Sequence, residues 1–123
     1  MQRYTKTHEW IVPERDGTIA VGITPFAMSV IGQIVGIWFA PTGQHLCAGE
    51  PCVALESAKV VCDVTAPVAG VVTSINMELN ESFASLNRAP ESTWIFRLRP
   101  AASSDIDELL DVQAYRSLIR TPT

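Results

Sequence analysis

Short apolar runs, some alternating with polar residues and some continuous, fill the first hundred positions, and glycine or proline interrupts them at short intervals. Such runs predict β-strands, because alternating apolar side chains cover one face of a sheet and continuous runs are buried on both. The expected strands span residues 18–24, 34–39, 51–55, 60–66, 68–75 and 94–99. Many short strands separated by turns are typical of a barrel or sandwich. The sequence therefore predicts a mainly β fold.

A short helix is predicted directly after the first of these strands. Thr24 suits the N-cap, because its hydroxyl can accept a hydrogen bond from a free N–H of the first turn. Pro25 suits the first helical position, and Gly32 suits the residue just past the end. These signals predict a helix over residues 25–31.

The C-terminal tail carries a second set of helix signals. Ser103 and Ser104 precede several acidic residues, whose charges are favoured at a helix N-terminus. Apolar residues then recur at helical spacing, so helices are expected near residues 104–119, and Asp111 can cap the second of them. We expect this amphipathic tail to pack on the β core, with docking to a partner as the alternative.

The composition narrows the function classes. The 123 residues are 47% hydrophobic, which supports a buried core and excludes a disordered chain. The net charge of −4 includes no basic cluster, so neither nucleic acid nor a membrane surface is expected as a partner. The N-terminus lacks a signal-peptide pattern, and no apolar run could span a bilayer. We expect a bacterial cytoplasmic protein, or one of the mitochondrial matrix if a presequence has been removed.

Three cysteines, Cys47, Cys52 and Cys62, lie in apolar, strand-like contexts. An odd number in such contexts fits buried reduced thiols better than a disulfide framework. No CxxC pair or histidine cluster accompanies them, so no metal site is expected.

Lysine is rare in this chain, which contains only Lys6 and Lys59. Lys59 lies between two strand-like runs of similar length, and Gly49 and Gly70 mark a turn on either side, so it is expected at a hairpin tip. A lysine there can be a solvated charge, a catalytic amine or an acylation site. A catalytic amine needs a desolvated pocket that lowers its pKa, whereas acylation needs exposure and a fixed turn, which a hairpin tip provides.

Segments on both sides of this lysine form a wider pattern. They are Gly49-Glu50-Pro51, Glu56-Ser57-Ala58-Lys59 and Ala66-Pro67-Val68-Ala69-Gly70, with further matches at Tyr4, His8-Glu9-Trp10, Gly22-Ile23-Thr24, Trp94, Asp107-Glu108-Leu109-Leu110-Asp111 and Ala114-Tyr115. Together they resemble the glycine cleavage system H-protein family, with its lipoyl-lysine signature. The resemblance implies a lipoyl-type barrel-sandwich hybrid of two small antiparallel sheets. One lipoyl-bearing domain would span residues 1–123, with a β core at about 3–100 and a helical extension at about 103–120.

The resemblance implies a carrier without catalytic activity of its own. Lipoate would be joined by an amide to Lys59, through a lipoate ligase or a lipoyl/octanoyl transferase. In the family, the carrier takes an aminomethyl group from glycine decarboxylase (P protein) to an aminomethyltransferase (T protein), and dihydrolipoamide dehydrogenase (L protein) reoxidises its dithiol. Two alternatives stay open: a lipoate relay or regulated lipoyl carrier outside glycine cleavage, and an unmodified barrel used as an interaction module.

The resemblance also assigns roles to residues around the lysine. The residues expected to mark the tip for the ligase are Glu56, Ser57, Ala58 and Val60. The residues that match a cleft for the returning arm are Thr7, Glu9, Trp10 and Asp63. The aminomethyl amine is cationic and its link is prone to hydrolysis, so Glu9 and Asp63 are expected to hold it while Trp10 excludes water.

Two stretches depart from the family pattern. Residues 36–41 lack an acid that the family has there, and residues 83–93 differ in length and composition. In the family these loops flank the carrier face. We therefore expect any change of function in docking to the aminomethyltransferase rather than in lipoylation.

Overall fold

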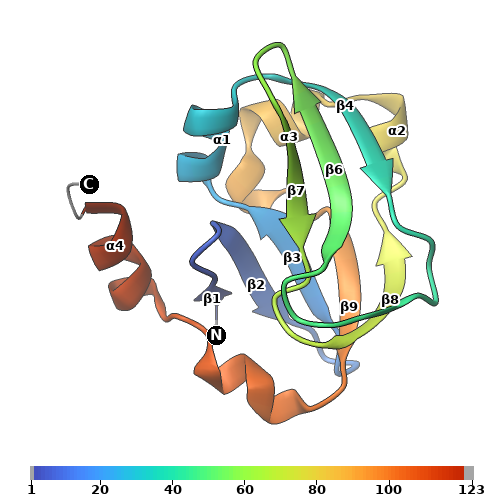
Figure 1. Cartoon of the computed structure of the whole chain (residues 1–123), viewed down its shortest axis with the longest axis vertical. Coiled ribbons are helices and arrows are strands. Elements are labelled where there is room, and N and C mark those ends of the chain that lie inside the picture. The colour runs from blue at the N-terminus through green and yellow to red at the C-terminus, as the bar shows by residue number, and fades with distance from the viewer. Residues whose placement is uncertain (1, 121–123) are drawn as a thin grey trace.

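A computed structural model describes residues 2–120 of the chain. Over these residues the strands form two antiparallel sheets, one in the order β1-β2-β3-β9-β8-β5 and one in the order β4-β6-β7. The strands are β1 (Arg3–Tyr4), β2 (Glu9–Pro13), β3 (Ile19–Ile23), β4 (Ile34–Phe39), β5 (His45–Leu46), β6 (Pro51–Ser57), β7 (Val61–Thr65), β8 (Gly70–Ile75) and β9 (Phe96–Pro100). The predicted mainly β fold of two antiparallel sheets is confirmed. The β6–β7 hairpin projects at the top of Figure 1.

The core lies between the two sheets. The largest fully buried side chains include Ile11, Ile19, Phe96 and Leu98 from the six-stranded sheet and Val53 and Leu55 from β6. Every second side chain of a strand points inward, which is the alternation seen in the sequence. Full burial of one such aliphatic or aromatic side chain stabilises the fold by roughly 1.5–3 kcal/mol.

Helix α1 (Pro25–Ile31) begins and ends where the sequence predicts. Thr24 Oγ1 accepts a hydrogen bond from Ala27 N at 3.2 Å. Gly32 ends the helix with φ at 89°, a conformation that glycine adopts without steric penalty. Ala27 and Ile31 are buried, which holds α1 beside the β6–β7 hairpin (Figure 1).

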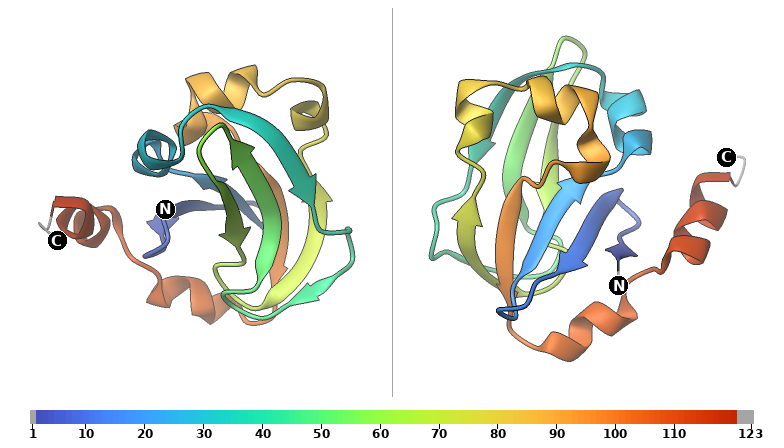
Figure 2. Two further views of the ribbon diagram at one scale, coloured as in Figure 1. Left: turned by 45° about the horizontal axis from the view of Figure 1, so that its top comes forward. Right: turned by 180° about the vertical axis from the view of Figure 1, so that it is seen from behind.

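The C-terminal tail forms two helices of different kinds. They are η2 (Ser103–Glu108), a 3-10 helix, and α4 (Val112–Arg120), an α-helix. Asp111 caps α4, because its Oδ1 accepts from Ala114 N at 2.8 Å. The predicted helices and this cap are confirmed, although the first helix is the tighter 3-10 form. Figure 2 shows that α4 stands beside β1, at the edge of the larger sheet rather than over its face.

Three short helices between residues 78 and 92 were not predicted. They are α2 (Glu78–Glu81), α3 (Ala84–Arg88) and η1 (Pro90–Ser92). Each buries a single residue, so none shows the repeating apolar face by which a helix is found in a sequence. The Asn87 side chain ties this segment to β4, because its amide bonds the N and O of Ile34 at 2.7 and 3.1 Å.

Candidate functional site

Lys59 lies at the exposed tip of the β6–β7 hairpin. Ser57 N donates to Val60 O at 2.9 Å, which closes a tight turn with Ala58 and Lys59 at its centre. Ala58, Lys59 and Val60 are all exposed. No carboxylate of the described residues lies within ion-pair distance of the Lys59 ammonium. The structure therefore places this lysine where the sequence predicts, with its amine open to a modifying enzyme.

Ser57 anchors this tip from inside. Its side chain is buried, at 7% exposed, and its Oγ donates to Ile31 O at 2.7 Å at the C-terminal end of α1. The same oxygen accepts from the N of Lys59 and the N of Val60, both at 3.2 Å. The bonds of Ser57 hold the turn against α1, and its part at a tip that a ligase approaches stays a prediction.

Replacing Ser57 with Ala is expected to loosen the tip. The change leaves Ile31 O without its donor and two turn N–H groups without their acceptor, and losses of buried hydrogen bonds cost about 1–3 kcal/mol. Urea unfolding should show this drop, and the amides of Lys59 and Val60 should exchange faster. Ala58→Ser, at the exposed neighbouring position, is the matched control and should shift stability by less than about 0.5 kcal/mol. An unchanged unfolding free energy for Ser57→Ala would contradict the anchoring role.

The Lys59 side chain leans over the end of α1. A Cβ placed on Gly32 would lie 3.4 Å from Lys59 Cε, so the aliphatic part of the lysine passes close to this glycine. Because Gly32 has no side chain, the path from the hairpin tip across the end of α1 stays open. The Lys59 side chain is therefore close to the C-terminal end of α1, whose residues line two separate hollows.

A pocket of about 330 Å³ lies between α1, β7 and the segment that enters β2. Its lining comes from Phe26, Ala27, Val30 and Ile31 on α1, from Cys62, Asp63 and Val64 on β7, and from Thr7, His8, Glu9 and Ile23. Most of the lining is apolar. A mostly apolar pocket with a few polar groups is typical of sites for small molecules and cofactors.

Glu9 is the buried acid of this pocket. It is 1% exposed, and its carboxylate accepts from Thr5 Oγ1, from Thr7 Oγ1 at 2.5 Å and from Thr65 N at 3.2 Å. No cationic side chain of residues 2–120 forms an ion pair with it. Since the donors that hold it are neutral, its charge remains available to a cation that enters the pocket.

Trp10 lies on the other side of β2 from the pocket. Successive side chains of a strand face opposite sides, so Glu9 and Trp10 cannot line the same wall. The indole packs on Gly22, where an added Cβ would lie 2.3 Å from the ring, and its Nε1 donates to Pro90 O at 2.9 Å. The prediction that Trp10 shields the cargo is therefore wrong. The apolar wall is supplied by α1 instead.

The other predicted site residues lie at the edge of the pocket, at the tip of the β6–β7 hairpin and on the outer face of the three-stranded sheet. Asp63 is exposed and lines the pocket together with Thr7. Glu56 is half-buried against β4, where its Oε1 would lie 2.9 Å from a Cβ on Gly36. It lies on the same side of the three-stranded sheet as Val61, its register partner on β7. Asp63 is on this side as well, but of these residues only Asp63 and Thr7 line the pocket, and Glu56 does not.

The two predicted turn glycines are required for different reasons. Gly49 has φ at 86° in the turn before β6, as expected for a glycine turn. Gly70 is instead the first residue of β8, and a Cβ there would lie 2.3 Å from Arg99 O on β9. The predicted turn role of Gly70 is wrong, because the close approach of two strands requires this glycine.

His8 belongs to the pocket although it was not predicted as a site residue. Its ring packs on Phe26, with centroids 4.7 Å apart, and its Nδ1 hydrogen-bonds Tyr115 Oη at 2.9 Å. Burial lowers the pKa of His8, and the negative charge of Glu9 opposes part of this change. His8 is therefore mainly neutral at pH 7.

The cysteines differ in exposure. Cys52 is buried, and burial raises its pKa to about 12. Cys62 is half-buried in the pocket wall, and burial together with the charges of Asp63 and Glu9 raises its pKa. Both side chains are therefore protonated thiols at neutral pH. Cys47 is exposed, contrary to the expectation that all three are buried.

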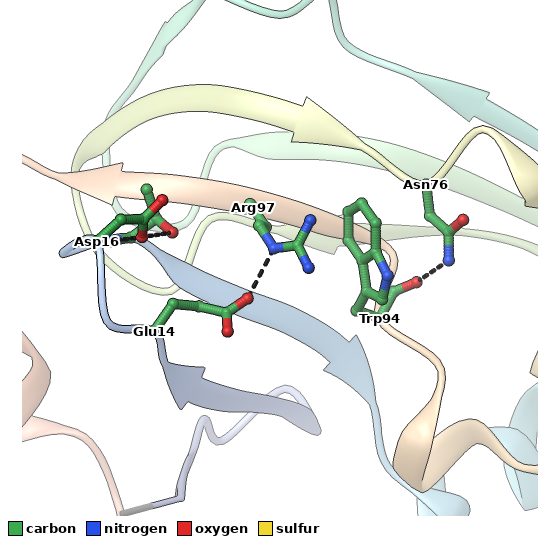
Figure 3. Close-up of polar contacts among 6 residues, drawn as sticks. Glu14, Asp16, Asn76, Trp94 and Arg97 are labelled. Carbon is green, nitrogen blue, oxygen red and sulfur yellow. Dashed lines mark hydrogen bonds and ion pairs between the residues drawn. The ribbon is translucent and has the colours of Figure 1, made fainter.

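A larger and more open hollow, of about 620 Å³, lies on the outer face of the six-stranded sheet. Figure 3 shows Arg97 there between Glu14 and Trp94. Its Nε donates to Glu14 Oε1 at 2.7 Å, and its guanidinium carbon lies 3.9 Å from the Trp94 ring centroid. Asp16 accepts from the N and Oγ1 of Thr18. Because these charges are already partnered within the protein, the candidate site is the pocket beside Lys59.

An exposed lysine on a fixed turn, close to a mostly apolar pocket, fits a protein that carries a covalently attached group. The family model described as Glycine cleavage H-protein matches residues 2–121. The Glycine cleavage system H protein of Thiobacillus denitrificans is 40% identical over 119 residues, which cover 97% of this chain and 92% of that protein. That of Thermus thermophilus is 40% identical over 119 residues, covering 96% and 92%. A crystal structure of a glycine cleavage system H protein from Mycobacterium marinum matches with a TM-score of 0.85 at 30% identity, covering 98% and 97%.

The chain therefore belongs to the glycine cleavage H-protein family. It is the lipoyl carrier of glycine cleavage, a subunit without catalytic activity that works with the other proteins of that system. The predicted family, function and non-enzymatic character are confirmed. Within residues 2–120, no helix has the length and apolar character needed to cross a membrane.

Proposed function

We propose that Lys59 carries the lipoyl group and that the pocket between α1, β2 and β7 receives it. The placement of the lysine supports this most: its Cε lies close to Gly32, at the end of the helix that forms one pocket wall. The pocket suits the group, because its walls are mostly apolar and Glu9 supplies one buried acid. Bound lipoate supplies a dithiolane that takes up the aminomethyl group when glycine is decarboxylated.

Glu9 and Asp63 attract the aminomethyl cargo, whose amine is cationic at neutral pH. Glu9 is buried, so its attraction for a cation is screened less than it would be in water. Asp63 is exposed at the rim, where the same charge contributes little binding energy and serves to draw the cation inward. Glu9 therefore attracts the cationic cargo more strongly than Asp63 does.

Apolar side chains keep water away from the cargo. Phe26, Val30 and Ile31 on α1 line one side of the pocket, and Val64 on β7 lines the other. Excluding water slows hydrolysis and strengthens the attraction to the buried acid. The Cys62 thiol adds to this wall without competing as a nucleophile, because its pKa is raised.

We further propose that the P, T and L proteins of glycine cleavage are the partners, in the bacterial cytoplasm. Membership of the family and the bacterial relatives support this. A lipoate ligase or a lipoyl/octanoyl transferase would modify Lys59 and read the exposed Ala58 and Val60, with Glu56 on the adjoining sheet face. Residues 36–41 and 83–93, which depart from the family pattern, adjoin the surface that these partners would contact.

Reconstitution with purified glycine decarboxylase tests this proposal. The lipoylated chain is expected to support release of labelled carbon dioxide from glycine, and the unlipoylated chain is expected to support only background release. Adding aminomethyltransferase and tetrahydrofolate should then discharge the cargo. A lipoylated chain that the decarboxylase ignores would overturn the assignment and favour a lipoate relay.

A further inference from the structure

Helix α4 is attached to the rest of the protein mainly through one side chain. Of the residues of α4, only Tyr115 is buried, at 5% exposed. Its ring stacks on Tyr4 of β1, with centroids 4.6 Å apart and planes 9° apart. Figures 1 and 2 show that α4 otherwise stands clear of the two sheets. Tyr115 is therefore the main buried contact of α4, beside the half-buried Ile119, which lines a hollow with Thr24 and Phe26.

The Tyr115 hydroxyl joins two separate segments. Its Oη lies 2.7 Å from Thr24 Oγ1 and 2.9 Å from His8 Nδ1. Thr24 Oγ1 also accepts from Ala27 N at 3.2 Å, as the N-cap of α1. If Thr24 donates to Tyr115 and Tyr115 donates to the neutral His8 ring, one continuous chain of hydrogen bonds satisfies all these groups.

Both segments are walls of the pocket that adjoins Lys59. His8 lines the pocket directly, and α1, which Thr24 caps, contributes Phe26 and three further residues. The rings of His8 and Phe26 also touch each other, with centroids 4.7 Å apart. Tyr115 itself does not line the pocket, so it supports the two walls from behind.

His8 also requires outside support for its backbone. Its φ is 71°, and no other residue of the described chain apart from glycine has a positive φ. Such a conformation is unfavourable for a side chain with a Cβ and persists only where the surroundings hold it. Backbone hydrogen bonds to Thr5 and Thr24 hold His8. On the side-chain side, the bond to Tyr115 and the contact with Phe26 add to this hold.

We propose that Tyr115 is a positioning residue for the cargo pocket, acting through His8 and the Thr24 cap. When α4 packs on β1, the Tyr115 hydroxyl keeps the two pocket walls formed by His8 and α1 at the spacing that encloses the cargo. This inference rests on the proposal that the pocket receives the group on Lys59. It gives the C-terminal helix a part in protecting the cargo, in addition to packing on β1.

Tyr115→Phe tests this role, because it keeps the ring that stacks on Tyr4 and removes only the hydroxyl. The lipoylated variant, loaded by glycine and glycine decarboxylase, is expected to lose its aminomethyl cargo about fivefold faster than the parent, in keeping with the loss of one or two hydrogen bonds. Intact-mass measurements over time give this rate. Lipoylation of Lys59 should proceed at the parent rate, since the hairpin tip is unchanged.

The unlipoylated protein gives a second readout. An accepted hydrogen bond favours the neutral imidazole, so its loss in Tyr115→Phe is expected to raise the pKa of His8, as followed by NMR of the ring. Burial, which lowers this pKa in the parent, is unchanged. Tyr4→Phe is the matched control, because it removes a hydroxyl from the same stack but not from the bonded chain. It should change neither the cargo lifetime nor the His8 pKa.

The outcomes separate this inference from the proposed function. If the parent protein protects its cargo, and Tyr115→Phe matches it in both cargo lifetime and His8 pKa, the positioning role is overturned while the pocket assignment stands. If the parent protects no better than free lipoamide, the pocket assignment itself fails. If Tyr4→Phe changes the cargo lifetime and the His8 pKa as much as Tyr115→Phe does, the effect comes from the stacked rings. That result would also overturn the role of the Tyr115 hydroxyl.

Discussion

Lys59→Arg is expected to abolish both lipoylation and carrier function. The guanidinium keeps the positive charge of the tip, but it stays protonated in proteins and offers no free amine for acylation. After co-expression with lipoate ligase and lipoate, intact mass should show one lipoyl adduct on the parent chain and none on the variant. Release of labelled carbon dioxide from glycine should fall to background.

Lys6→Arg is the matched control, because Lys6 is the one other lysine in the sequence. It should keep the adduct and full carrier activity. An adduct retained on Lys59→Arg, or lost from Lys6→Arg, would contradict the assignment of the attachment site. The same comparison tests the reading of the chain as an unmodified interaction module, which predicts no adduct on either variant.

Glu9→Gln is expected to shorten the lifetime of the cargo by roughly tenfold to a hundredfold, the range that corresponds to loss of a hydrogen bond to a charged group. The amide has nearly the same shape as the carboxylate but carries no charge to attract the cationic amine. Its oxygen can still accept from Thr65 N, and its NH₂ can donate to the hydroxyls of Thr5 and Thr7, which can rotate to accept. The fold should therefore persist.

Asp63→Asn serves as the comparison for Glu9→Gln. Asp63 is exposed, and solvent screens its charge, so a change of at most about threefold in cargo lifetime is expected. Both lifetimes can be followed by intact mass after loading with glycine and the decarboxylase. Equal lifetimes for Glu9→Gln and the parent would refute the electrostatic role of the buried acid.

Local signals predicted the elements that present Lys59. The cap at Thr24 and the terminal Gly32 gave the bounds of α1, because hydrogen bonds of neighbouring residues decide where a helix begins and ends. Two strand-like runs around Lys59 gave the hairpin, because its pairing joins residues close in sequence. These features needed no knowledge of distant contacts.

The errors came from neighbouring residues that were assigned the same environment. Glu9 and Trp10 adjoin in the sequence but face opposite sides of β2, as the two-residue period of a strand requires. Thr5 and Thr7, which both donate to the Glu9 carboxylate, lie in the turn before β2, where the strand period does not apply. Applied to β2, the period would have removed Trp10 from the site, whereas Thr5 is brought to Glu9 only by the turn.

The remaining site residues depend on contacts between distant segments. His8 meets Tyr115 across almost the whole chain, and Glu9 on β2 meets Thr65 on β7 of the other sheet. A single sequence carries no local pattern for such pairs, since each depends on how the two sheets and α4 pack. The burial of Ser57 is of the same kind, because it follows from contact with the end of α1.

The central claim is that the group carried on Lys59 occupies the pocket between α1, β2 and β7. Backbone amide NMR of the cargo-loaded chain, compared with the unlipoylated chain, tests it most directly. The account predicts that the largest shift changes fall on Glu9, Val30, Ile31 and Cys62, with little change on the far face at Arg97. Changes confined to residues 58–60 would show a group that stays in solvent at the tip and would contradict the claim.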